Sequence, residues 1–194
     1  PGTREAWRTS YAAGVRAFDR ALGGFLDTLA VEAIEDDFIL IVTSDHGEEL
    51  VEHGAWGHGD ELYEEQLWVP LLIVPPGSPV EGRRVERVVS LIDVMPTLLA
   101  MSGIEAPAGI AGQDLGPLLR GGDLEGEARA FASGVKRRPD MKMVRTQAEK
   151  LVRDQQPGSV RLFDLSEDPA ERHNLAGSDT AGLAQLDALL AQHR

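Results

Sequence analysis

The apolar run from Phe38 to Val42 restricts the possible folds of this chain more than any other feature. Its residues, FILIV, are all apolar and mostly β-branched, with no polar residue among them. Such a run is typical of a strand that is buried on both faces, as inside an α/β sheet. The residues that follow this strand should therefore lie at the carboxyl edge of the sheet. In open α/β sheets that edge is where ligands bind.

Potential ligands are crowded into the stretch TSDHGEELVEHGAWGHG, residues 43–59, which directly follows the predicted strand. It holds three of the five histidines, four carboxylates and four glycines. Asp45 and His46 come first, and Gly47 gives the backbone the freedom to turn both side chains toward one metal. A carboxylate oxygen and an imidazole nitrogen suit Ca²⁺, Mg²⁺ or Mn²⁺ as a partial ligand set, and imidazole also admits zinc. The alternative is a turn in which Asp45 caps backbone amides.

The rest of the chain divides near Gly126 into two differently patterned regions. Before it, apolar spacing predicts a helix over 7–29 packed on a sheet, a helical turn over 61–66 and a second strand over about 69–74. The stretch SLIDVMPTLLAMSG predicts a short helix with Asp93 as its N-cap, and a helical turn is predicted over 117–119. After it come strand-like segments separated by turn-like Pro-Asp, Gln-Ala and Pro-Gly pairs: ARAFASG, MKMVRT, EKLVRD and VRLFDL. Their close spacing predicts an antiparallel sheet, because parallel neighbours need long crossovers. A final helix is predicted from Thr180 to His193.

Composition excludes several classes of partner and site. The formal net charge of −13 argues against nucleic acid and anionic membrane as partners, because its field repels polyanions. The absence of cysteine rules out a disulfide frame, a cysteine zinc site and a cysteine nucleophile within these residues. No apolar run approaches the roughly 20 residues of a membrane span, and no signal-peptide pattern is present.

The stretch TSDHGEELVEHGAWGHGDELYEEQLWVPLLIVPPG resembles the second metal-binding segment of the sulfatase family, within the alkaline phosphatase superfamily. The similarity continues, in the order typical of the family, through RVERVVSLIDVMPTLLAMSGI, GIAGQDLGPLLRG and KLVRDQQPGSVRLFDLSEDPAERHNLA. The resemblance implies an α/β fold. In it, residues 1–126 form the C-terminal part of the main sulfatase domain, and residues 127–194 form a small α+β subdomain whose antiparallel sheet is packed by the C-terminal helix.

The resemblance also implies roles for three residues. Asp45 matches the carboxylate that binds the metal in this segment, and His46 stands where many members have Asn and others His. Ca²⁺ is the usual metal of sulfatases, while an imidazole at this place leaves Mn²⁺ or Mg²⁺ open. His58 falls where the family commonly has a lysine that contacts the leaving oxygen or the transferred sulfate. An imidazole there can act as a hydrogen-bond donor or general acid.

Two features expected of a complete sulfatase are absent from the sequence. The family's nucleophile is a formylglycine made within a Cys/Ser-x-Pro-x-Arg motif, and no such motif occurs here. The aspartate pair of the family's first metal segment is absent too. The resemblance therefore implies the C-terminal portion of a longer enzyme that hydrolyses sulfate monoesters, inactive without its N-terminal half and exported to the periplasm or outside the cell.

Two other functions remain open from the sequence. One is a phosphonate or phosphodiester hydrolase of the same superfamily, in which relatives also carry Asp-His-Gly. The other is a non-catalytic module in which Asp45, His46, His53 and His58 form a self-contained zinc site. His53 itself is equally consistent with supporting the metal ligands and with shaping the loop.

Overall fold

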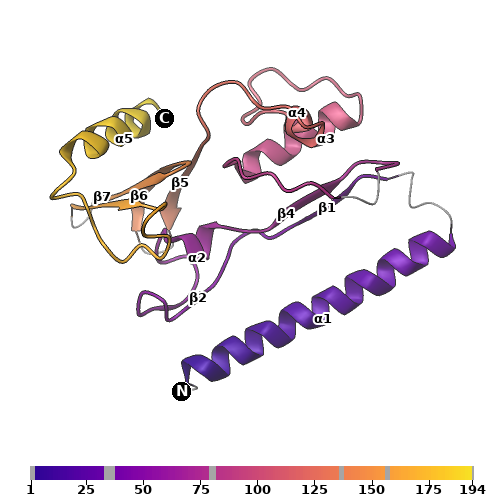
Figure 1. Cartoon of the computed structure of the whole chain (residues 1–194), viewed down its shortest axis with the longest axis horizontal. Coiled ribbons are helices and arrows are strands. Elements are labelled where there is room, and N and C mark those ends of the chain that lie inside the picture. The colour runs from indigo at the N-terminus through magenta and orange to yellow at the C-terminus, as the bar shows by residue number, and fades with distance from the viewer. Residues whose placement is uncertain (1–2, 33–37, 79–81, 136–137, 156–157, 194) are drawn as a thin grey trace. The chain divides into compact units, whose positions relative to one another are not determined.

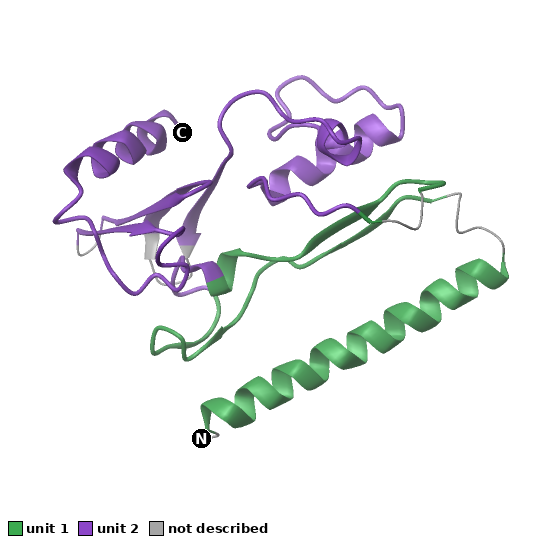
Figure 2. Ribbon diagram, in the orientation of Figure 1, with its two compact units in different colours: residues 1–58, 65–82 green, residues 59–64, 83–194 purple. Residues whose placement is uncertain are grey.

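The computed structural model describes residues 3–32, 38–78, 82–135, 138–155 and 158–193 (Figure 1). The chain divides into two compact units (Figure 2). Residues 1–58 and 65–82 form unit 1, and residues 59–64 and 83–194 form unit 2. The segment 59–64 therefore belongs to unit 2 although both of its neighbours in sequence belong to unit 1.

Unit 1 contains the two strands predicted around the ligand-rich stretch. Strand β1 (Leu40–Thr43) pairs antiparallel with β4 (Leu71–Val74), with Leu40 opposite Val74. Both begin two residues later than predicted. The prediction of burial on both faces is wrong for β1, whose first three residues are half-buried and whose last is exposed. Within the described residues this sheet has two strands, so its faces and outer edges keep contact with solvent.

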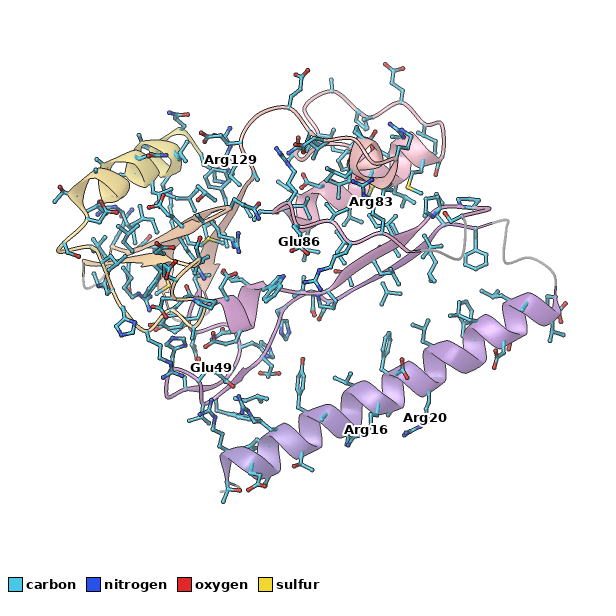
Figure 3. All side chains as sticks on the ribbon, viewed as in Figure 1. Arg16, Arg20, Glu49, Arg83, Glu86 and Arg129 are labelled. Atoms are coloured by element: carbon cyan, nitrogen blue, oxygen red, sulfur yellow. The ribbon has the colours of Figure 1, made fainter. Side chains whose placement is uncertain are left out.

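Helix α1 (Arg4–Val31) confirms the predicted helix but not its predicted packing. Thr3 caps its start by accepting a hydrogen bond from the Ala6 amide. None of its described side chains is buried, and the exposed apolar residues form what we call the α1 apolar face: Trp7, Tyr11, Val15, Phe18 and Phe25. Charged side chains such as Arg16 and Arg20 are exposed as well (Figure 3).

The N-terminal turns of α1 contact the hairpin formed by β2 (Glu49–Leu50) and β3 (Trp56–Gly57). The ring centroids of Trp7 and Trp56 lie 4.1 Å apart. Arg4 and Arg8 donate to the Glu52 carboxylate at 3.3 and 2.9 Å. Burial raises the pKa of Glu52, but the hydrogen bonds from Arg8, from backbone amides and from Arg4 bring this pKa below its ordinary value. The helix start is therefore held by an aromatic contact and two ion pairs.

Unit 2 is built around the predicted antiparallel sheet. Strands β5 (Arg129–Val135), β6 (Arg138–Thr146), β7 (Glu149–Asp154) and β8 (Ser159–Asp164) are hydrogen-bonded in that order. The predicted Pro139-Asp140 turn is wrong, because both residues lie within β6. The turn at Gln147-Ala148 is confirmed, and that at Pro157-Gly158 falls partly outside the described residues.

Helix α5 (Thr180–Gln192) confirms the predicted C-terminal helix and covers one face of this sheet. Asp179 caps it by accepting from the Gly182 amide at 2.9 Å. Its buried leucines complete a core cluster with one residue from each of β6, β7 and β8: Val144, Leu151, Leu162, Leu186 and Leu190. Alternate residues of each strand point to this core, as the period-2 pattern requires.

The predicted helix around Asp93 forms as a 3₁₀ turn, η1 (Leu91–Asp93), followed by α3 (Val94–Met101). Asp93 precedes α3 as predicted, but its carboxylate accepts from the Ser90 and Gln113 amides, at 2.8 and 2.9 Å, and does not cap α3. It therefore ties a distant loop to the start of the helix. The predicted turn after Pro117 is α4 (Gly116–Leu119). No described helix is both long and apolar enough to cross a membrane.

Candidate functional site

The candidate site begins where β1 ends, and Gly47 determines the path of the backbone there. The Gly47 amide donates to the Gln66 carbonyl at 2.8 Å, which brings the chain against α2 (Glu64–Leu67). A Cβ atom at position 47 would lie 2.1 Å from the Glu65 carbonyl oxygen. Glycine is therefore required here for the close approach of two backbone segments.

Asp45 and His46 present an oxygen and a nitrogen to the same region. His46 Nδ1 lies 2.7 Å from the Gly47 carbonyl oxygen, which can only accept, so Nδ1 carries the proton. In a neutral ring with this tautomer, Nε2 is the nitrogen that offers its lone pair to a metal. This Nε2 is 3.8 Å from Asp45 Oδ1, and Asp45 is largely exposed. The same Asp45 oxygen accepts from the His46 backbone amide at 3.1 Å, the capping contact that the sequence left as the alternative to a metal ligand. A carboxylate oxygen and an imidazole nitrogen are, by type, a partial ligand set for a divalent cation.

His58 reaches the same region from twelve residues along the chain. Its ring stacks on that of His46, with centroids 3.7 Å apart and planes at 29°. Its Nδ1 lies 3.1 Å from Glu48 Oε1, so the carboxylate orients the ring. The three residues that the sequence singled out, Asp45, His46 and His58, therefore lie together on one half-exposed surface.

A buried carboxylate shapes the loop between these histidines. Glu49, which is labelled in Figure 3, is fully buried. It accepts from the amides of His53 and Ala55 at 3.1 and 2.8 Å. It also accepts from Gln66 Nε2 at 3.1 Å. Glu48 is the same residue type at the adjacent position, so the sequence could not tell which of the two is buried. Glu49 gives the loop a defined shape because a buried carboxylate must keep its donors.

His53 belongs to the loop framework in this structure. Its Nδ1 lies 2.6 Å from Glu65 Oε1, and both side chains are mostly buried. Among the described residues, no three His, Asp or Glu side chains are placed to hold one metal ion. The self-contained zinc site allowed by the sequence is therefore not assembled in the described part of the chain. Asp45 and His46 alone supply two side chains of the types that bind divalent cations.

Comparison with known proteins relates this geometry to a family. The sulfatase family model matches residues 3–104, slightly more than half of the 194 residues. Arylsulfatase K of Xenopus laevis is 31% identical over 196 residues, which cover 94% of this chain and 36% of that protein. A structure solved in complex with its substrate D-glucosamine-2-N,6-O-disulfate has a TM-score of 0.78 at 27% identity, covering 92% of this chain and 38% of that one.

A further solved structure has a different activity in its name. The phosphonate monoester hydrolase of Agrobacterium radiobacter has a TM-score of 0.75 at 31% identity, covering 91% of this chain and 39% of that one. The chain thus spans a little over a third of the length of these relatives. The neighbouring structures agree with the predicted α/β fold class, and the sulfatase family implies a divalent metal and a formylglycine. By the extent of the family match and of the alignments along its length, the chain belongs to the sulfatase family.

Proposed function

We propose that this chain is the C-terminal portion of a longer, metal-dependent enzyme that hydrolyses sulfate monoesters. The observation that carries the proposal is the stacking of His58 on His46, beside Asp45, at the end of β1. It joins a pair of potential metal ligands to a proton donor within a chain of the sulfatase family. The proposed division is residues 1–126 in the main domain and 127–194 in the small subdomain.

Each side chain has a distinct part in the proposed reaction. Asp45 Oδ1 and His46 Nε2 hold the cation, Ca²⁺ or otherwise Mn²⁺ or Mg²⁺, and the Gly47 carbonyl keeps His46 in the ligating tautomer. The cation would stabilise negative charge on the transferred sulfate. His58, oriented by Glu48, donates a hydrogen bond or a proton to the leaving oxygen. Glu49 and Gly47 keep the loop in the shape that brings the two histidines together.

The nucleophile of the proposed enzyme lies outside this chain. The 194 residues hold no cysteine and no Cys/Ser-x-Pro-x-Arg motif, so a formylglycine has to come from the preceding half. Without it the chain alone is inactive, because positioning without a nucleophile leaves the main step undone. The α1 apolar face supports such a missing half, since an exposed row of large apolar side chains normally marks a surface covered by other protein.

The substrate of the parent enzyme is proposed to be a small sulfate ester, with a sulfated sugar or an aryl sulfate as the first to test. The sugar is suggested by the neighbour solved with a disulfated glucosamine, and the aryl ester by the similarity to arylsulfatase K. The proposed location is the periplasm or the cell exterior, as the family resemblance suggests.

The alternative activity is phosphonate monoester hydrolysis. It is favoured by one observation, the phosphonate hydrolase structure at 31% identity, which is higher than the 27% of the sugar-sulfate neighbour. Both reactions cleave an ester of a negatively charged sulfur or phosphorus oxyacid, and a bound metal would stabilise that charge in either one. The residues described here therefore suit both reactions.

The full-length protein decides between these functions. Its rate on an aryl sulfate should exceed its rate on an aryl phosphonate, and His58→Ala should reduce the sulfatase rate by about 100-fold or more, the usual worth of a general acid. His173→Ala is the matched control, because His173 is exposed in unit 2 and should leave the rate unchanged. A faster phosphonate reaction would move the assignment to the alternative, and a His58→Ala protein as active as the parent would remove His58 from the mechanism.

A further inference from the structure

The segment 59–64, GDELYE, lies on the face of the unit 2 sheet that α5 leaves uncovered. Glu61 Oε2 accepts from Arg161 of β8 at 2.8 Å. The same guanidinium lies 4.9 Å from the centre of the Tyr63 ring, and that ring is 6.2 Å from Phe163. One short stretch of chain is therefore held on the sheet by an ion pair, a cation–π contact and an aromatic contact.

The end of this segment enters a buried group of charges that we call the Lys150 cluster: Glu64, Arg145, Lys150 and Glu171. Lys150, on β7, is fully buried, and its Nζ lies 3.0 Å from Glu64 Oε1 and 2.8 Å from Glu171 Oε1. Arg145 Nε lies 3.2 Å from Glu64 Oε2. Glu171 Oε2 also accepts from the Glu64 backbone amide at 2.6 Å. Two cations and two carboxylates thus surround the point where the segment leaves the sheet.

This cluster is costly to assemble, so stability alone does not explain it. Burial raises the pKa of the Glu171 carboxyl despite the opposing effect of Lys150. Glu171 also adopts a φ of 51°, a left-handed conformation that residues with a side chain rarely use. Apolar side chains of similar volume often stabilise a fold as well as buried ion pairs do. What the charges add is a defined position for Glu64, because each carboxylate oxygen has its own partner.

The residues on either side of the segment belong to the candidate site. His58 immediately precedes it, and Glu65, which follows Glu64, pairs with His53 at 2.6 Å. Gln66 contacts the site twice, through its carbonyl to the Gly47 amide and through its side chain to Glu49. Anchoring residues 59–64 therefore restrains both ends of the loop that carries His53 and His58, through the covalent chain itself.

We propose that Lys150 is a positioning residue for the candidate site, acting through Glu64 on the loop that carries His58. This inference rests on the proposed role of His58 in the reaction. Lys150 does not touch the reacting atoms. It restrains Glu64, and the covalent chain passes this restraint to Glu65 and Gln66, which contact the loop.

The test is amide hydrogen exchange of the full-length protein and three variants. Glu64→Gln weakens the cluster from the segment side and leaves the strands intact, and Lys150→Met removes its central cation. Lys150→Arg keeps the charge and should retain most of the protection of residues 47–66 against exchange. In the first two variants we expect exchange at residues 47–66 to accelerate at least about 10-fold, as for a locally opened segment, with β6 and β8 unchanged in Glu64→Gln.

A matched control separates positioning from general support of the sheet. Arg153→Met removes the ion pair between Arg153 of β7 and Asp187 of α5, on the same strand as Lys150 but away from the segment. It should leave exchange at residues 47–66 unaltered. Should Lys150→Met unfold the sheet, Glu64→Gln alone decides. Unchanged exchange at 47–66 in Glu64→Gln, or an equal rise in Arg153→Met, would overturn the proposal.

Activity provides an independent reading. In the full-length enzyme, Glu64→Gln should lower kcat by about 10-fold with little change in KM, because a displaced donor is missed mainly in the transition state. A protein inactive on sulfate and phosphonate esters would refute the proposed function and leave the exchange result standing. Accelerated exchange at 47–66 with kcat unchanged would instead overturn the positioning role while leaving the proposed function intact.

Discussion

The sheet of unit 2 and helix α1 of unit 1 have equally clear apolar patterns and opposite burial. Leu151 and Leu162 of the sheet are almost completely buried, and they pack on α5. Phe18, in the middle of the α1 apolar face, is 57% exposed. The difference shows that periodicity predicts whether a segment is a helix or a strand and which of its faces is apolar. Burial of that face depends on another segment of the chain that packs on it, as α5 does on the sheet.

The largest expected effect would test this comparison directly. Leu151→Ala should lower the free energy of unfolding of the small sheet by about 2–5 kcal/mol, because it opens a cavity in a closed core. Phe18→Ala should change the stability of the 194-residue chain by less than about 0.5 kcal/mol, as exposed substitutions do. Denaturant unfolding of both variants measures the contrast. Equal losses would show that the α1 apolar face is covered in solution.

A second contrast concerns two glycines in unit 1. Gly47→Ala should destabilise the loop by about 1–3 kcal/mol, because its Cβ would collide with the Glu65 carbonyl and force backbone shifts. Gly23→Ala in α1 meets nothing within 4 Å and should stabilise the helix by about 0.5–1 kcal/mol. Thermal unfolding measures both changes. Opposite signs are required, and a harmless Gly47→Ala would mean that the loop does not approach α2 closely.

Metal binding provides a third, more local test. Mn²⁺ added to the full-length protein should broaden the ring resonances of His46 and His58, whose rings are stacked, and leave those of His173 sharp. Asp45→Asn should weaken Mn²⁺ affinity by at least about 10- to 100-fold, which is the usual cost of removing even an outer partner of a metal ligand. The exposed His173→Ala should not change it. Broadening confined to His173 or His53 would place the cation elsewhere.

The smallest expected effect lies at the start of α5. Burial and the nearby carboxylates of Asp179 and Asp164 raise the pKa of Glu149. Because its folded-state pKa exceeds the unfolded value, the folded state binds more protons between the two values, and stability falls as pH rises through this window. Glu149→Gln should flatten that fall and stabilise unit 2 at neutral pH by about 0.5 kcal/mol or less.

Urea unfolding at several pH values between 4 and 8 would measure this, with the exposed Glu127→Gln as control. If the fall in stability with rising pH persists unchanged in Glu149→Gln, another group causes it. Glu171, whose pKa is also raised by burial, is then the first group to examine.

Local patterns predicted most elements of this structure correctly. The four strands and the final helix of unit 2 were found because alternation and helical spacing were both clear, and the turn chemistry at Gln147-Ala148 agreed with them. The turn predicted at Pro139-Asp140 was wrong because β6 extends through it. Tertiary pairing of strands overrides the local turn preference of such a pair.

The candidate site was only partly predictable. Asp45 and His46 are adjacent in sequence, so the predicted strand end and the turn at Gly47 were enough to predict that their side chains lie close together. The stacking of His58 on His46 depends on an irregular loop whose shape is set by buried Glu49 and by the Glu65 pairing with His53. Lys150 was missed because a lysine in a strand normally indicates a face in contact with water.

By itself, the sequence determined which segments form helices and strands, the location of the candidate site within residues 43–59, and the family to which the chain belongs. Those properties depend on neighbours in sequence or on ordered motifs. Only the tertiary structure decided that α1 has no buried face, that Glu49 and Lys150 are buried, and that segment 59–64 belongs to unit 2. These outcomes depend on partners distant in sequence, because a charge can be buried only where its counter-charges converge on it.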